Sequence, residues 1–275
     1  MTPGQFAEAR IAELGISDPS EIDVDAIAFD AQMLVEYEDL DGCEATLVGV
    51  GDRAIATVRP SGVRGRARFS VGHELGHWEM HRGKSFYCRV DDPDSNLKSD
   101  KPREKEADEY SAHLLMPSSL FNPAVKSLGK PGFRELDDLA QYFETSLLAT
   151  SIRLVDIDTV PVVLACYSSS GLRWRKFAAH VPSRWWLRDK LDEDAFAYDL
   201  LTKGTRTACA RKQPGEVWFE NDDAENYEVT EECMPAKAGE VLVVLYLSSS
   251  MMDARFDPNV GVRRYNERGS YVKRK

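Results

Sequence analysis

The sequence predicts an α+β fold made of two domains, 1–157 and 158–275, and three observations support this. Up to residue 157, helical apolar patterns alternate with short strand patterns separated by Asp-Gly and Gly-Asp turns. After Asp158 the apolar segments become strand-like, as in VPVVLACYS and EVLVVLYLS. The 275 residues are 43% hydrophobic and 29% charged, which is ordinary for one large or two smaller globular domains.

The N-terminal elements follow from local patterns. Residues 4–14 and 22–32 repeat apolar residues with helical spacing, and the strand patterns MLVEYED, ATLVGVG and AIATVRP come next. ARFSVGHELGHWEMHRG predicts a helix with Ser70 as its N-cap. A polar loop at 84–102 is long enough to act as a lid, and a further helix is expected over 102–116.

The remaining elements are a helical pair and a second domain. Residues 135–155 predict two short helices around Glu144–Ser146, and their acidic character counts against contact with DNA phosphates. The C-terminal domain should be α/β or α+β. GLRWRKFA and EVWFE predict strands, and residues near 184–203 predict a helix. No motif there identifies a role.

Composition limits location and partners. The net charge of −11 disfavours nucleic-acid binding by the whole protein. No apolar run is long enough to span a membrane, and the N-terminus lacks a signal-peptide pattern. Five scattered cysteines without a CxxC motif predict reduced thiols and a cytoplasmic location. We interpret two basic segments as solvated faces, the arginine-rich run 53–68 and the basic end VRRYNERGSYVKRK. For the arginine-rich run, the alternative is that it flanks a groove for an acidic peptide.

HELGH at residues 73–77 is the most informative motif. Two histidines four apart lie on one helix face, so His73 and His77 can bind one metal ion, and Glu74 can reach a water on it as general base. Zinc with three protein ligands keeps a fourth position for that water. The alternative is two surface histidines on an ordinary helix. The next helix favours the metal site, since its acids Glu104 and Asp108 are also four apart.

The pieces AIATV, RARFSVGHELGHWEMH and EKEADEYSAHLLMP, with their flanks over 22–155, resemble the ImmA/IrrE family of metallo-endopeptidases. The resemblance implies a zincin-like metallopeptidase domain that binds Zn²⁺ through His73, His77 and Glu104. It implies that Asp108 orients a ligand histidine. It also implies cleavage of a helix-turn-helix repressor, with roles in transcription regulation and stress response, and a GAF-like sensory C-terminal domain.

Helix geometry distinguishes the acids of the second metal helix. Residues two apart point to nearly opposite faces, so Glu106 cannot share a metal with Glu104. Glu104 shares its face with small residues, whereas Glu106 shares its face with Tyr110 and His113, which are expected to be bulkier and more solvated. Glu104 is therefore the predicted ligand, in agreement with the resemblance.

Several residues keep two interpretations. His81 is either an oxyanion stabiliser or a cation near a helix C-terminus. Cys88 is either a thiolate switch at the metal or an inert cysteine. Tyr87 and Tyr110 remain open as oxyanion donors. The strand Ala54–Val58 is expected to be the sheet edge that binds an extended substrate.

Three functions compete at this point. The first is a zinc endopeptidase that cleaves a repressor, and the second is a non-catalytic zinc-containing regulator that binds a partner protein. The third, a DNA-binding regulator, is disfavoured by the net charge. An intact Glu74 favours the first function over the second, because a structural zinc site needs no base.

Overall fold

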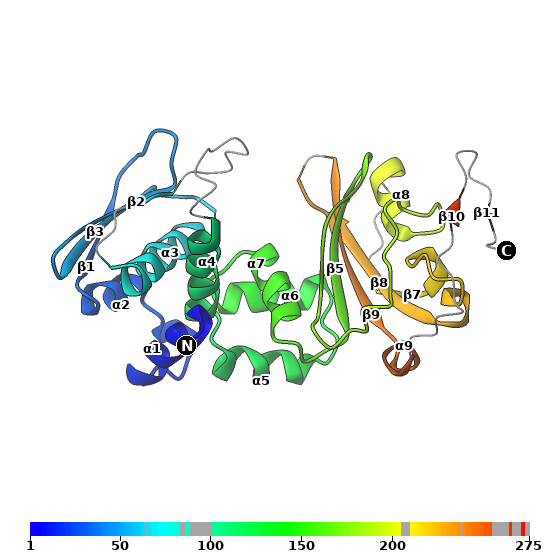
Figure 1. Ribbon diagram of the computed structural model, residues 1–275, viewed down its shortest axis with the longest axis horizontal. Helices are drawn as coiled ribbons and strands as arrows, with labels where there is room; N and C mark the ends of the chain where they lie inside the picture. The colour runs from blue at the N-terminus through cyan, green and yellow to red at the C-terminus, as the bar shows by residue number, and fades with distance from the viewer. Residues whose placement is uncertain are drawn as a thin grey trace. The chain divides into compact units, whose positions relative to one another are not determined.

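The computed structural model describes residues 1–63, 65–82, 86–88, 101–204, 210–237, 239–254, 264–265 and 271–272. The chain divides into two compact units. Unit 1 comprises Met1–Ser127 and Leu136–Arg153, and unit 2 comprises Leu128–Glu135 and Leu154–Lys275. Both units combine helices with a sheet (Figure 1), which confirms the α+β fold. The boundary near residue 157 between independently folding domains stays a prediction.

Unit 1 is built on a four-stranded sheet with the order β1-β3-β2-β4. The strands are β1 (Met33–Tyr37), β2 (Ala45–Val50), β3 (Arg53–Val58) and β4 (Phe86–Cys88). β3 pairs in parallel with β1 and antiparallel with β2, and β2 also pairs with β4. The expectation that Ala54–Val58 is a free edge is therefore wrong, because β3 has a hydrogen-bonded neighbour on each side.

Helix α3 (Arg66–Met80) packs on the buried face of this sheet, together with α2 (Val24–Asp30). Trp78 of α3 is buried, and its indole N–H donates to the Ala31 carbonyl over 2.7 Å. The helix begins at Gly65, whose φ of 75° is the left-handed region that glycine adopts readily. The prediction of Ser70 as N-cap is wrong, since Ser70 lies inside the helix.

Unit 1 has further helices. They are α1 (Pro3–Glu13), α4 (Lys101–Leu115), α5 (Ser118–Leu128), α6 (Phe133–Tyr142) and α7 (Leu147–Asp156). Of these, α4 packs on α3 and α1 packs on α4. The predicted helices at 4–14 and 102–116 and the helical pair in 135–155 are present. Helix α5 is an addition to the prediction, and its internal Pro123 weakens the helical signal in the sequence.

Unit 2 contains a five-stranded antiparallel sheet with the order β6-β5-β9-β8-β7. Its strands are β5 (Val162–Ser168), β6 (Gly171–Phe177), β7 (Arg211–Pro214), β8 (Glu228–Pro235) and β9 (Glu240–Leu247), with helices α8 (Phe196–Lys203) and α9 (Ser249–Asp253). β5 and β9 are buried almost throughout, as their continuous apolar runs predict. The antiparallel pairing identifies the unit as α+β, and its GAF-like character stays a prediction.

Two predictions in unit 2 are wrong. EVWFE does not form a strand, because Gly215–Val217 is a 3-10 helix and Phe219 makes an isolated bridge to Leu187. Of the predicted helix near 184–203, only α8 is helical. No helix in the part of the chain that the structure describes has the length and apolar character needed to cross a membrane.

Candidate metal centre

Two glycines set the distance between the helices that carry the site. A Cβ atom added at Gly72 would lie 2.6 Å from the Ser111 hydroxyl of α4, and one at Gly76 would lie 3.0 Å from the Cβ of Tyr110. Any larger residue at either position would therefore push α4 away from α3. The pairing of Gly72 with Gly76 was not predicted, although their i, i+4 spacing is visible in VGHELG.

The close approach brings three potential ligands together. The Nε2 atoms of His73 and His77 are 3.1 Å apart. The Glu104 carboxylate places Oε2 3.2 Å from Nε2 of His73 and Oε1 3.4 Å from Nε2 of His77. One ligand atom from each of the three residues lies within 4.8 Å of the others, and both histidines are buried. The structure thus groups the three residues predicted as ligands, although their role as ligands stays a prediction.

The spacing of these atoms fits a small metal ion. A tetrahedral zinc ion with bonds of about 2.0–2.1 Å separates its ligand atoms by about 3.3–3.4 Å, close to the distances found here. Two imidazoles and one carboxylate are also a donor set that leaves a fourth position for water. The three residues could therefore bind a metal ion.

Asp108, expected to orient a ligand histidine, contacts the ring of His73. Its Oδ1 is 2.9 Å from Nδ1 of His73. A carboxylate can only accept, so Nδ1 of His73 carries the proton and Nε2 faces Glu104 and His77. This contact would leave Nε2 as the nitrogen that a metal ion could bind, and the role of Asp108 in orienting His73 stays a prediction.

Burial and hydrogen bonding act against each other on the ionisable groups. Burial disfavours the charged form of His73, but hydrogen bonds to Asp108 and Glu104 outweigh it and raise its pKa to about 10. Burial opposes ionisation of Glu104 too, yet the two imidazoles lower its pKa to about 2. Burial lowers the pKa of His77. A metal ion must therefore displace a proton at this site, as is usual for histidine ligands.

Glu74, the predicted base, is fully buried on α3 between the two histidines in sequence. Successive helix residues are about 100° apart, so its side chain leaves α3 in a different direction from the imidazoles. The arrangement permits the role of base, which stays a prediction.

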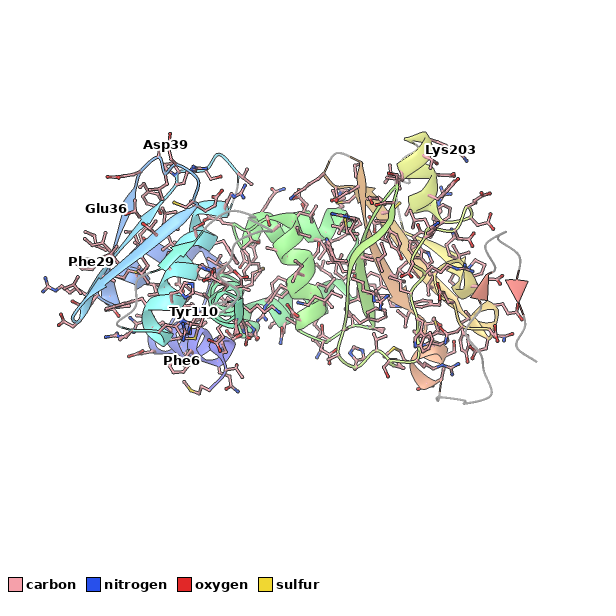
Figure 2. All side chains as sticks on the ribbon, turned by 45° about the horizontal axis from the view of Figure 1, so that its top comes forward. Phe6, Phe29, Glu36, Asp39, Tyr110 and Lys203 are labelled. Atoms are coloured by element: carbon pink, nitrogen blue, oxygen red, sulfur yellow. The ribbon has the colours of Figure 1, made fainter. Side chains whose placement is uncertain are left out.

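The residues whose roles the sequence left undecided lie in different surroundings. Both ring nitrogens of His81 face protein groups, Nδ1 toward His77 and Nε2 toward Glu106. Tyr110 is fully buried within the helical layer and donates to Glu79, so the expectation that it is solvated is wrong (Figure 2). Cys88 belongs to β4, and its side chain and that of Tyr87 lie outside the described residues, as do most of the loop 84–102 and the basic end.

His113 belongs to a second, structural cluster. Its Nδ1 lies 2.9 Å from Oε1 of Glu8. The same oxygen accepts from Ser118 and from Arg153, a side chain that is almost completely buried. The cluster joins α1, α4, α5 and α7. We therefore assign His113 a role in the stability of unit 1.

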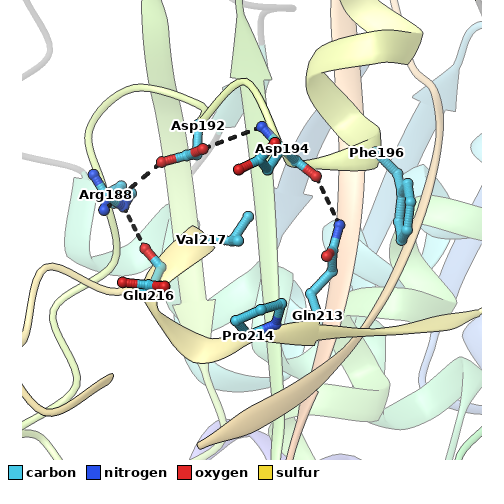
Figure 3. A pocket seen from close by; sticks show the side chains of 8 residues that line it. All are labelled: Arg188, Asp192, Asp194, Phe196, Gln213, Pro214, Glu216 and Val217. Atoms are coloured by element: carbon cyan, nitrogen blue, oxygen red, sulfur yellow. Dashed lines mark hydrogen bonds and ion pairs between the residues drawn. The ribbon is translucent and has the colours of Figure 1, made fainter. Parts of the chain in front are cut away.

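A pocket of about 500 Å³ lies in unit 2 (Figure 3). Arg188 crosses its rim, where it donates to the Glu216 carbonyl over 2.8 Å and approaches Asp192 at 3.7 Å. On the opposite wall Gln213 donates to the Asp194 carbonyl. The lining is mainly polar and its groups bond to one another, unlike the largely apolar lining of most small-molecule sites.

Fold and site together define an α+β domain with an HExxH motif and three residues that could hold a metal ion. Residues 57–155 match the model of peptidase family M78, described as the IrrE N-terminal-like domain. The resemblance seen in the sequence is therefore confirmed for this segment, and the chain carries an IrrE N-terminal-like domain.

Among solved structures, a protein described as a Mycobacterium tuberculosis transcriptional regulator matches with a TM-score of 0.60. The two chains are 13% identical, and the match covers 89% of this chain and 76% of the other. At this identity the likeness shows the fold alone. No curated protein sequence matches the chain.

Proposed function

We propose that this protein is a zinc-dependent endopeptidase. The observation that carries the proposal is the single Glu104 carboxylate that meets both imidazoles of HELGH, with Glu74 buried beside them. A bound zinc ion would polarise the peptide carbonyl and lower the pKa of a water to about 7. A site that was only structural would not require an acid at position 74.

Each residue has a separate task in this proposal. His73, His77 and Glu104 hold the ion, and Asp108 fixes the tautomer of His73. Glu74 removes the proton of the attacking water and then delivers it to the leaving amine. Because Glu74 is buried, little water competes for this carboxylate.

The proposed substrate is a helix-turn-helix repressor, whose cleavage would release the genes it controls, including stress genes. The resemblance to the ImmA/IrrE family supports this choice. Such a substrate would place the protein in the cytoplasm. The free thiols of Cys43, Cys166 and Cys233 agree with that location. Direct nucleic-acid binding and membrane association are not part of the proposal.

The test mixes the protein and zinc with helix-turn-helix repressors encoded beside its gene, and cleavage is followed by mass spectrometry. Glu74→Gln should reduce cleavage at least about 100-fold, because only the base is lost, while zinc affinity changes by a few-fold. The matched control is Glu13→Gln, a glutamate of α1 whose side chain is 70% exposed.

A non-catalytic regulator is the alternative, and the description of the mycobacterial structure as a transcriptional regulator favours it. That alternative requires Glu74→Gln to keep full regulation of the repressor. Peptidase activity that survives in Glu74→Gln would refute the catalytic mechanism.

A further inference from the structure

Two histidine nitrogens face each other behind the metal centre. Nδ1 of His77 lies 3.2 Å from Nδ1 of His81, one helical turn further along α3. Two imidazole nitrogens can form a hydrogen bond only if one carries a proton and the other offers a lone pair. The direction of this bond therefore decides which tautomer His77 adopts.

Glu106 settles the direction. Its Oε2 is 2.9 Å from Nε2 of His81, and a carboxylate accepts only, so Nε2 of His81 carries a proton. In a neutral His81, Nδ1 then has the lone pair and accepts from Nδ1–H of His77. Nε2 of His77 is left with its lone pair, on the side where Glu104 and His73 lie.

The surroundings of His81 keep this geometry in place. His81 caps the C-terminus of α3, and its backbone N–H donates to the His77 carbonyl over 2.8 Å. Its side chain is only 11% exposed. A histidine that acted as a solvated cation at the helix end would leave its ring in water instead.

We propose that Glu106 and His81 form a relay that holds His77 in the tautomer of a metal ligand. A carboxylate then orients each histidine ligand. Asp108 contacts His73 directly, whereas Glu106 acts on His77 through the imidazole of His81. His81 is thus a positioning residue. The inference rests on the proposed function insofar as it assumes a metal at His73, His77 and Glu104.

The test measures zinc affinity by competition with a chelator for two pairs of variants. His81→Leu and Glu106→Leu each remove the relay, and zinc affinity should fall about 10- to 100-fold, the usual effect of losing a partner behind a metal ligand. His81→Asn should stay within a few-fold of wild type, because its amide oxygen can accept in place of Nδ1. Glu106→Gln should do the same, since its amide oxygen still accepts from His81.

The double variant His81→Leu/Glu106→Leu should lose no more affinity than either single variant, because the two residues act in series. Lys105→Gln, an exposed neighbour of Glu106 on α4, is the control. Circular dichroism of each metal-free variant checks that the fold persists.

Three results would overturn the relay. They are wild-type affinity in His81→Leu, additive losses in the double variant, or a loss in His81→Asn equal to that in His81→Leu. Failure of the proposed function would give a different experimental result. If the wild-type protein binds zinc with this variant pattern but cleaves no repressor, the relay stands and the peptidase proposal falls.

Discussion

Adjacent residues in the GHELGH segment of α3 have different roles. In GHELGH each histidine follows a glycine, and neighbouring helix positions are about 100° apart. The glycines face α4, so each imidazole leaves the helix at the margin of the α3–α4 contact, where Glu104 reaches both. A metal site at this margin needs the glycines as much as the ligands.

The grouping of His73, His77 and Glu104 could be predicted because i, i+4 spacing places the histidines on one face and opposed faces separate Glu104 from Glu106. The surroundings of the other face of α4, which carries Glu106 and Tyr110, could not be predicted. Tyr110 is buried because α4 is packed on two sides, and Glu106 meets His81 because of how α4 docks on α3. Local sequence patterns do not show how one helix packs on another.

The pair Glu104→Gln and Glu106→Gln tests the orientation of α4 at the residue level. Glu104→Gln removes the charged ligand and should lower zinc affinity more than about 100-fold, beyond the loss typical of an outer residue. Glu106→Gln keeps an acceptor for His81 and should change affinity only a few-fold. Metal titration of both variants gives the ranking. The reverse order would mean that α4 presents its other face to α3.

Among the elements, the helices of unit 1 are tied by a buried charge cluster. Arg153 of α7 donates to the Met116 carbonyl over 3.0 Å and lies 2.8 Å from Nε2 of His113. Glu8 supplies the compensating charge from α1. Such a buried arginine is tolerated only with its partners in place.

Most elements of unit 1 were predictable because their signals are local: apolar periodicity, turn residues and capping. The errors arise where distant contacts decide. Helix α3 is capped by Gly65 rather than Ser70. A Cβ on Gly65 would lie 2.7 Å from the backbone of Glu144 and Thr145, a contact that the local pattern does not contain. In unit 2, the sequence did not predict β8, because its buried face (Val229, Glu231 and Cys233) includes a glutamate that interrupts the apolar alternation.

Glu8 predicts an acid dependence for the helix cluster. Burial alone would raise its pKa, but hydrogen bonds from His113 and Ser118 outweigh this and lower it from 4.5 to about 2. A depressed pKa stabilises the fold above pH 4.5, and this contribution is lost as pH falls through 2. Glu8→Gln should therefore cost about 2–3 kcal/mol at pH 7, with the difference from wild type shrinking below pH 4.5.

Urea unfolding of the metal-free protein between pH 2 and 7 measures this difference. Glu13→Gln on the same helix is the control, because Glu13 is 70% exposed and pairs with Arg10 at the surface. Its cost should be under about 1 kcal/mol. An equal cost for the two variants at every pH would contradict the role given to Glu8.

For the whole molecule, the chain passes between the two units more than once. Residues 128–135 leave unit 1 and belong to unit 2, where the Phe133 amide donates to Glu232 and the Tyr246 hydroxyl donates to the Pro131 carbonyl. The change of composition near residue 157 indicated a single boundary. The earlier excursion was invisible in the sequence because it depends on partners about 100 residues away.

A chain ending at Ile157 tests whether unit 1 is an independent metal-binding domain. The three proposed ligands, Asp108, His81 and the Glu8–Arg153 cluster lie before that point, so the shortened protein should fold and bind one zinc ion with affinity within about tenfold of the full chain. Residues 128–135 lose their partners, and Phe133, which is 7% exposed in the full chain, would become a surface residue. Phe133→Ser in the shortened chain should therefore leave zinc binding unchanged and improve solubility, whereas the same change in the full chain should destabilise unit 2. Zinc titration and thermal unfolding of the four proteins provide the comparison. A shortened chain that does not fold, with or without the substitution, would show that the two units depend on one core.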